Sequence, residues 1–286
     1  MPREEILRAG RERSLVGVAS LPDPSMAQRC GVVLLNAGLV HRVGPARLWV
    51  TLARRLSALG HPALRLDFSG IGDSPDATDS ARFETRAARE ACAAMDALGE
   101  LAQVQRFALI GLCSGAEIAF KAALEDSRVC ALVLVNAPRF LEEPSAELVA
   151  SLERKQAARY YWTVALRNPR SWWKALRGRA DLGAMAQAGL ARLRAMGKRR
   201  APAPESADAR AFRALALRGV RIQLVLSQGD WAQDYLDSIL GPESAANSAR
   251  GAVEIAIVKH CDHLLTPLVA QRSLLEHVQR WAADWS

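Results

Sequence analysis

The hydrophobic positions of the chain fall into short apolar runs that alternate with amphipathic stretches. Each run is rich in Val, Leu, Ile and Ala and is bounded by turn residues, as expected of strands buried on both faces. Because strands alternate with helical patterns, we predict an α/β fold with a mostly parallel sheet and helices on both faces. The predicted strands are Leu15–Ala19, Gly31–Leu35, Ala63–Phe68, Phe107–Leu112, Cys130–Asn136, Ile222–Ser227 and Val253–Val258.

Several of the intervening stretches have apolar residues at helical spacing. The clearest follows the second predicted strand, where leucines at positions 48, 52, 56 and 59 share one helix face. Glycine follows this stretch and the next one and serves as a stop signal. The predicted helices are Arg47–Leu59, Phe83–Leu98, which ends at Gly99, and Val269–Trp281.

One long segment, from Pro138 to about Arg218, contains no β-rich run and is full of Arg, Ala and aromatic residues. It predicts a helical insertion that folds over the strand ends as a lid. Trp162 and its aromatic neighbours either line an acyl pocket or pack the lid onto the body. The expected organisation is a core in two parts, residues 1–137 and 219–286, interrupted by the insertion over residues 138–218.

Size and composition bound the class of protein. The chain has 286 residues, half of them hydrophobic, so it can bury a large core within one domain. No uninterrupted apolar run is long enough to span a membrane, and the first residues lack the apolar core of a signal peptide. The five cysteines form no CxxC pair, so neither a disulfide framework nor a metal site is indicated. A reducing cytoplasm is the expected location, where cysteines stay free thiols.

The net charge of +8 suits an acidic partner, such as an acidic acyl or peptidyl carrier protein, or simply supplies solvated faces. The arginines are mostly spread along the chain, and no nucleic-acid-binding motif is present. We therefore expect no nucleic-acid partner.

The pentapeptide Gly111-Leu112-Cys113-Ser114-Gly115 carries the strongest chemical signal. It lies between an apolar strand and a helix-forming stretch, which is the setting of a nucleophile elbow. The middle residue of an elbow has a strained backbone, and the flanking glycines keep Cβ atoms out of the bend. Serine is usual at the middle position, and this chain has Cys113 there.

A cysteine nucleophile needs a base that holds it as thiolate and a carboxylate that orients the base. Downstream of the elbow, His263 stands in the loop before the last predicted helix, with His260 as the alternative. For the carboxylate, Asp230 follows a glycine turn at a strand end, and Asp234 is the alternative.

Acyl transfer also needs backbone donors where the oxyanion develops. One is expected to be the N–H of Ser114, at the start of the elbow helix. Gly38 and Leu39, in the loop after the second predicted strand, are candidates for the other donor. In the same loop His41 and Arg42 are candidates to bind a polar end of the substrate, although pairing with Asp67 or Asp73 is an equally good structural account.

With these residues the chain resembles the α/β-hydrolase superfamily, specifically its serine-aminopeptidase-like or lysophospholipase-like branch. The resemblance covers nearly the whole chain and rests on Leu35–Gly38, a D-x-x-G-x-G-x-S turn over Asp67–Ser74, the elbow, Gly229-Asp230 and Asp262-His263. It implies Cys113 as nucleophile, Asp230 as acid and His263 as base, with Gly38 or Leu39 and Ser114 forming the oxyanion hole. The usual His-Gly before the oxyanion residue is absent here.

An elbow cysteine resembles dienelactone hydrolases and certain thioesterases and acyl shuttles of assembly lines. We therefore expect an enzyme that moves acyl groups from thioesters, carrier-bound or CoA-bound, through an acyl-cysteine, as thioesterase or acyltransferase. The alternatives are a carboxylesterase or lactone hydrolase with the same triad, and a non-catalytic binding protein. No metal or dissociable cofactor is implied, because side chains and backbone donors suffice for the mechanism.

Overall fold

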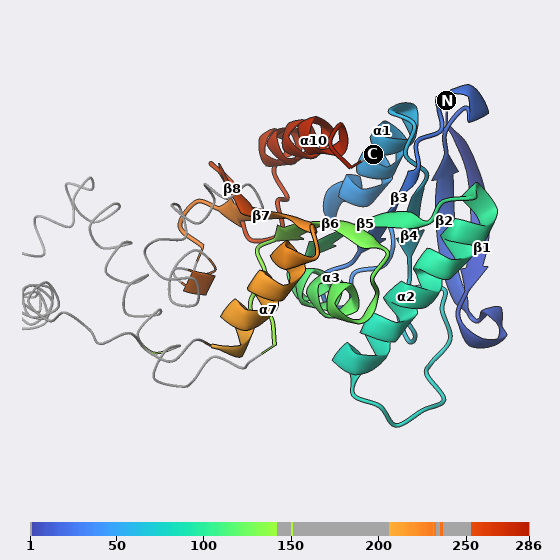
Figure 1. Cartoon of the computed structure of the whole chain (residues 1–286), viewed down its shortest axis with the longest axis horizontal. Coiled ribbons are helices and arrows are strands. Elements are labelled where there is room, and N and C mark those ends of the chain that lie inside the picture. The colour runs from blue at the N-terminus through green and yellow to red at the C-terminus, as the bar shows by residue number, and fades with distance from the viewer. Residues whose placement is uncertain are drawn as a thin grey trace, which may run out of the picture. The chain divides into compact units, whose positions relative to one another are not determined.

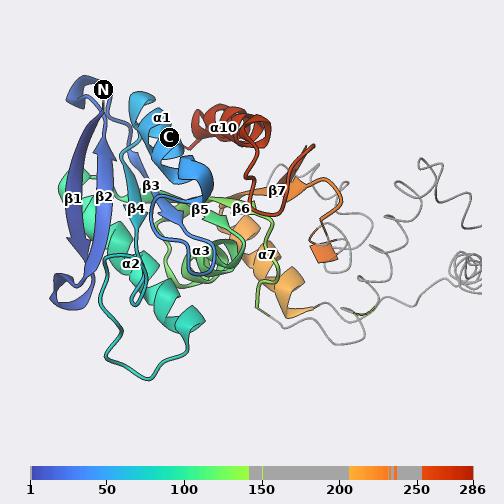
Figure 2. The same ribbon diagram turned by 180° about the vertical axis from the view of Figure 1, so that it is seen from behind.

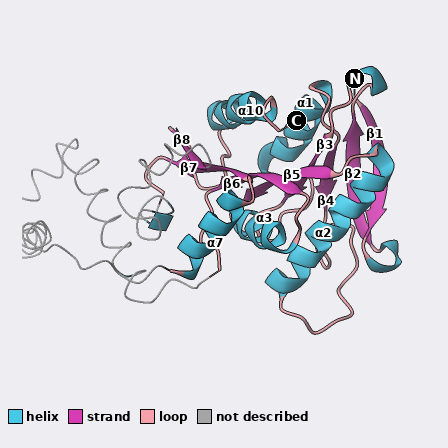
Figure 3. Ribbon diagram, in the orientation of Figure 1, coloured by secondary structure: helices cyan, strands magenta, loops and turns pink. Residues whose placement is uncertain are grey.

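The computed structural model describes residues 2–141, 150, 206–230, 232, 235–236 and 253–285. Its centre is an eight-stranded sheet in the order β1-β2-β4-β3-β5-β6-β7-β8 (Figures 1 and 3). The strands are β1 (Arg3–Ala9), β2 (Leu15–Leu21), β3 (Cys30–Leu35), β4 (Ala63–Leu66), β5 (Arg106–Leu112), β6 (Val129–Val135), β7 (Arg221–Ser227) and β8 (Val253–Val258).

The sheet is parallel from β4 to β8, whereas β2 runs antiparallel to both of its neighbours. In the parallel register, Ile110 at the centre of the sheet lies between Leu34 and Val133. Since parallel strands end at the same edge, the loops after β3, β5, β6, β7 and β8 gather there. This edge holds every catalytic candidate that the structure describes.

Helices cover both faces of the sheet. Figures 1 and 2 show α1 (Leu48–Ala58) and α10 (Leu268–Ala282) on one face. On the other face lie α2 (Phe83–Ala102), α3 (Ser114–Glu125) and α7 (Ala207–Leu217). Short 3-10 turns, η1 (Arg11–Arg13), η2 (Pro24–Met26) and η3 (Pro45–Arg47), occupy connections. The predicted α/β architecture is thus confirmed.

Side chains of α1 and α10 pack with the central strands into one buried core. Leu48, Leu52 and Leu56 of α1 are fully buried, as their helical spacing predicted, and Val278 of α10 joins the same cluster. Burial of an aliphatic side chain of this size stabilises a fold by roughly 1.5–3 kcal/mol. Burial of these apolar side chains is therefore the main source of the free energy that holds the helices against the sheet.

Two features differ from the sequence-based expectation. Strand β1 was not predicted, because its charged residues resemble a solvated terminus; in the structure Glu4 bonds Arg65 at 3.0 Å and Arg54 at 2.7 Å. Helix α2 continues past Gly99, the predicted stop, and ends with Gln103 in left-handed conformation (φ 54°). Gly99 serves packing instead, since a Cβ there would lie 3.0 Å from the carbonyl oxygen of Val104.

The chain divides into two compact units, Met1–Pro144 with Ala207–Ser286, and Ser145–Ser206. Helix α7 falls within the stretch predicted as insertion, yet it belongs to the first unit. There the ring of Phe212 packs against that of Phe120 of α3, with 4.7 Å between the ring centroids. The rest of the predicted lid lies almost wholly outside the described residues, so it stays a prediction. Within the ranges described above, no helix has the length and apolarity needed to cross a membrane.

Candidate functional site

Cys113 occupies a strained bend between β5 and α3. Its backbone has φ 54° and ψ −121°, a region that a non-glycine residue rarely adopts. The two elbow glycines make the bend possible: a Cβ on Gly111 would lie 2.2 Å from the carbonyl oxygen of Gly115, and a Cβ on Gly115 would lie 2.4 Å from that of Leu35. Backbone strain concentrates at functional positions, so the strained bend supports Cys113 as the candidate nucleophile.

His263 and Asp230 reach this position from the loops after β8 and β7. Nδ1 of His263 lies 2.7 Å from Oδ2 of Asp230, whose side chain is 8% exposed. The hydrogen bond with Asp230, followed by that with Cys113, raises the pKa of His263 to about 10. The ring therefore binds its proton firmly between a carboxylate and a sulfur, the arrangement of a nucleophile, base and acid.

The turn that holds Asp230 depends on its preceding glycine. Gly229 has φ 84°, and the amide of Asp230 donates to the carbonyl of Ser227 at 3.0 Å. The second carboxylate oxygen, Oδ1, accepts the amide of Ala232 at 2.9 Å. With one oxygen held by the backbone, the other is aimed at the imidazole.

Two buried polar residues that the sequence did not single out tie these loops together. The side-chain amide of Asn136, directly after β6, donates to the carbonyl of His263 at 2.7 Å and to Oγ of Ser227 at 2.8 Å. Its oxygen accepts the amide of Ser227 at 2.7 Å, and Ser227 Oγ donates to the carbonyl of Asp262 at 2.9 Å. Asn136 has φ 47°, which Asn tolerates better than most residues. The signal available in the sequence was that Asn136 is a lone polar residue at the end of an apolar strand.

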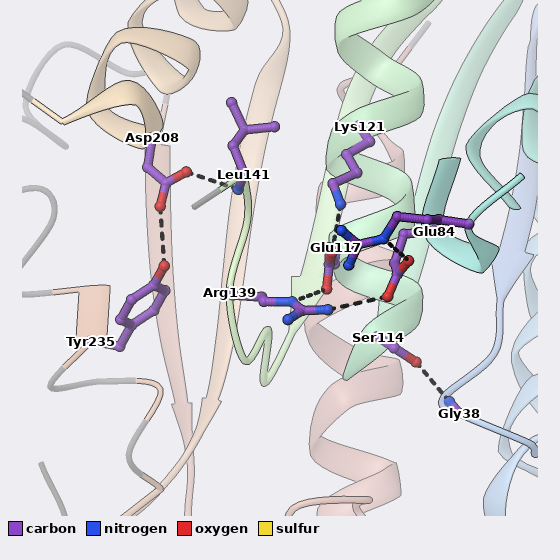
Figure 4. A network of polar contacts seen from close by, with 10 residues as sticks. Gly38, Glu84, Ser114, Glu117, Lys121, Arg139, Leu141, Asp208 and Tyr235 are labelled. Carbon is purple, nitrogen blue, oxygen red and sulfur yellow. Dashed lines mark hydrogen bonds and ion pairs between the residues drawn. The ribbon is translucent and has the colours of Figure 1, made fainter. Parts of the chain in front are cut away.

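Gly38 and Leu39, the candidate oxyanion donors, occupy a turn closed by the amide of Val40 on the carbonyl of Ala37 at 2.9 Å. The amide of Gly38 donates to Oγ of Ser114 at 2.7 Å (Figure 4). In the part of the chain that the structure describes, the amides of Leu39 and Ser114 have no acceptor. The loop after β3 and the start of α3 thus meet beside Cys113, as an oxyanion hole requires.

Arg42 has the structural role. Its guanidinium pairs with Asp67 and, at 2.5 Å, with Asp73, while its amide donates to Asp67 at 2.5 Å. The side chain of Asp67 is fully buried, and a Cβ on Gly72 would collide with it at 2.2 Å. These contacts support the structural account, in which Arg42 closes the Asp67–Ser74 turn, and substrate binding by Arg42 stays a prediction. His41 is exposed in the same loop.

A buried charge cluster lies one helical turn beyond the nucleophile, on α3. Glu117 is 3% exposed and pairs with Lys121 at 2.6 Å and with Arg139 at 2.9 Å. Arg139 also reaches Glu84 of α2 at 3.3 Å (Figure 4).

Further along, Asp208 of α7 accepts the amide of Leu141 at 2.8 Å and the hydroxyl of Tyr235 at 3.0 Å. These contacts anchor the segment after β6 to α3 and α7.

The remaining candidates separate clearly. His260 is exposed with φ 55°, whereas His263 bonds Asp230, so the geometry favours His263 as the candidate base. His277 stacks on Trp281 within α10. Asp234 and Trp162 lie outside the described residues. Among the residues with described positions, no group of three His, Cys, Asp or Glu side chains can hold a metal ion.

Comparison with known proteins shows the family of the chain. The family model of the alpha/beta hydrolase fold matches residues 31–238, more than half of the chain. The chain belongs to the alpha/beta hydrolase fold family. No curated protein matches the sequence.

Solved structures extend the likeness over the whole chain. A proline iminopeptidase from Mycobacterium smegmatis is 16% identical with TM-score 0.55, covering 99% of this chain and 98% of its own. A thermophilic esterase from Thermogutta terrifontis is 17% identical with TM-score 0.54, covering 99% and 98%. Naproxen esterase from Bacillus subtilis is 19% identical with TM-score 0.53, covering 98% and 91%. At this identity the likeness establishes the fold.

Proposed function

We propose that this α/β hydrolase is an acyl-transfer enzyme that takes acyl groups from thioesters through an acyl-cysteine at Cys113. The observation that carries the proposal is the chain of contacts from Asp230 through His263 to the elbow cysteine, with 2.7 Å between carboxylate and imidazole. Asp230 orients the ring, His263 exchanges protons, and the sulfur accepts the acyl group.

The reaction begins with the proton on the His263 ring, as its raised pKa favours, and with the sulfur of Cys113 as the thiolate. The thiolate attacks the substrate carbonyl carbon, and the C=O electron pair moves onto oxygen to form the oxyanion. When this pair re-forms the carbonyl, the bond to the leaving sulfur breaks, and that sulfur takes the proton of the imidazolium. Water or another acceptor then loses a proton to His263 and attacks the acyl carbon. The bond from that carbon to the sulfur breaks, which frees Cys113.

Thiolate chemistry favours a thioester substrate over an amide or oxygen ester. Exchange of one thioester for another changes bond energy little, whereas acyl transfer from an ester or amide to sulfur climbs from a stable group to a reactive one. A serine elbow avoids this climb for esters. The replacement of serine by Cys113 therefore supports thioesters as the substrate class.

The net charge of +8 supports a negatively charged carrier of the acyl group, either an acidic carrier protein or the phosphate-bearing CoA. His41, exposed in the loop after β3, stays the candidate to bind such a group. Trp162, in the predicted lid, stays a candidate for the acyl pocket.

A carboxylesterase or lactone hydrolase with the same triad is the second candidate. Its support is that solved structures of this fold include the esterases named above. Hydrolysis of oxygen esters would need the same three residues, so only substrate preference separates the two functions.

The test is turnover of a matched pair of substrates, an acyl thioester of N-acetylcysteamine and the oxygen ester of identical acyl chain. The wild type is expected to prefer the thioester, and Cys113→Ala to lose both activities. Cys113→Ser is the matched control, because it keeps the elbow and should shift the preference toward the oxygen ester. A faster oxygen-ester reaction in the wild type supports the esterase, and wild-type rates equal to those of Cys113→Ala exclude both functions.

A further inference from the structure

The hydroxyl of Ser114 lies where the two sides of the expected oxyanion hole meet. Its Oγ accepts the amide hydrogen of Gly38 at 2.7 Å, and Ser114 is also the residue whose backbone N–H follows the nucleophile (Figure 4). The two sides of the oxyanion hole, the loop after β3 and the start of α3, are thus joined through this one side chain.

This contact changes which groups are available as donors. The amide of Gly38 is already used, so it does not point a free hydrogen at a substrate. A hydroxyl has one hydrogen to donate and two lone pairs to accept with. Within the described ranges Ser114 Oγ accepts from Gly38 and donates to no group, so its own hydrogen is available.

The hydrogen bond from Gly38 also makes the hydroxyl a better donor. A hydroxyl that accepts a hydrogen bond is polarised, and consecutive hydrogen bonds strengthen one another by roughly 10–30%. The Gly38 amide therefore acts on an oxyanion through the Ser114 hydroxyl, even though it does not touch it.

The residues that the structure describes leave the turn beside the hydroxyl uncrowded. A Cβ on Gly38 would meet no atom within 4 Å, which identifies open space beside the turn. On the other side the helix is fixed, since Gly115 has no room for any side chain against the backbone of Leu35 and Asn36. The hydroxyl thus stands at a rigid helix start, next to a turn that is open at Gly38.

We propose that the Ser114 side chain is a catalytic residue of the oxyanion hole, donating its hydroxyl hydrogen to the substrate oxyanion beside its own backbone N–H. The proposal rests on the proposed acyl transfer and adds a donor to it. Ser114 forms no covalent bond and gives up no proton; it only shares its hydrogen while negative charge is on the oxygen.

The test compares two reactions of Cys113 in wild type, Ser114→Ala and Ser114→Thr. Acylation by a N-acetylcysteamine thioester in a single turnover needs the oxyanion hole. Alkylation by iodoacetamide displaces iodide and forms no oxyanion, so it reports only on the thiolate. Removal of one oxyanion donor commonly lowers the rate by about 10²–10³.

We expect Ser114→Ala to lower the acylation rate constant by about 10² without changing the substrate concentration at half-saturation. Its alkylation rate is expected to equal that of the wild type, and Ser114→Thr should restore acylation. Equal or faster acylation in Ser114→Ala overturns the proposal, because the hydroxyl would then be a bystander or an obstruction. A parallel loss of alkylation also overturns it, since the side chain would act on Cys113 instead. Absence of acylation in the wild type would refute the proposed function itself.

Discussion

At the scale of single residues, the candidate site depends on one proton, which the His263 ring holds between the sulfur of Cys113 and the carboxylate of Asp230. Cys113 was recognisable from the glycines around it, because only an elbow needs both. Asp230 and His263 were recognisable from their positions after strand ends. The pairing of Arg42 with Asp67 was foreseen only as one of two accounts, because sequence does not show which acidic residue an arginine reaches. The Ser114–Gly38 contact depends on loop geometry that no pattern encodes.

The protonation of His263 gives a direct prediction at this scale. A folded-state pKa of about 10, above the ordinary 6.5, means that the folded protein binds this proton more tightly than the unfolded chain. The resulting stabilisation is fully present below pH 6.5 and is lost as pH rises through about 10. The imidazolium of the folded protein, which the proposed mechanism needs, is lost only as pH rises through about 10.

NMR titration of the His263 ring should therefore give a midpoint near 10 in the wild type. Asp230→Asn removes the largest cause and should lower the midpoint most, and Cys113→Ala should lower it less. A wild-type midpoint at the ordinary histidine value would show that the ring is not held between the two partners.

At the scale of elements, the predictions that relied on apolar periodicity succeeded, whereas single glycines were a mixed guide: Gly60 follows the end of α1 as predicted, but Gly99 does not end α2. Strands β2 to β8 and helix α1 were predicted because burial imposes a pattern on many positions at once. Strand β1 was missed because it is rich in charged residues, and the partners of its Glu4, Arg54 and Arg65, lie far along the chain. Gly99 was read as a helix stop although its role is close packing.

The ends of β6, β7 and β8 are joined by the Asn136 side chain, and this joint should be needed for both stability and activity. Asn136→Ala leaves the buried amide of Ser227 without its partner and puts alanine at a positive φ. We expect a loss of about 1–3 kcal/mol in the free energy of unfolding and a fall in kcat, because the loops carrying Asp230 and His263 lose their tie. Urea denaturation and steady-state kinetics measure the two effects.

Ser227→Ala is the matched control for this joint, since it keeps the bond from Asn136 to the carbonyl of His263. Its losses should be smaller in both measurements. Equal kcat in Asn136→Ala and wild type would show that the joint supports the fold alone.

At the scale of the whole molecule, the sheet explains why residues so distant in sequence meet. The elbow follows the central strand β5, and the acid and base follow β7 and β8 at the same edge. The family membership and the α/β fold followed from the sequence because they depend on this repeated strand–helix order. The extent of the insertion was less predictable. Helix α7 packs on the core through aromatic contacts, but its sequence has the pattern of any amphipathic helix and does not show where the helix packs.

The central claim is that the sulfur of Cys113 itself carries the acyl group. Its most direct test is intact-protein mass spectrometry after acid quench of the wild-type enzyme mixed with an acyl thioester, followed by peptide mapping. The account predicts one acyl group per chain, located on Cys113, labile to hydroxylamine and absent from Cys113→Ala and His263→Ala. Turnover of the thioester with no acyl group on Cys113 at any quench time, or with the adduct on another residue, would contradict it.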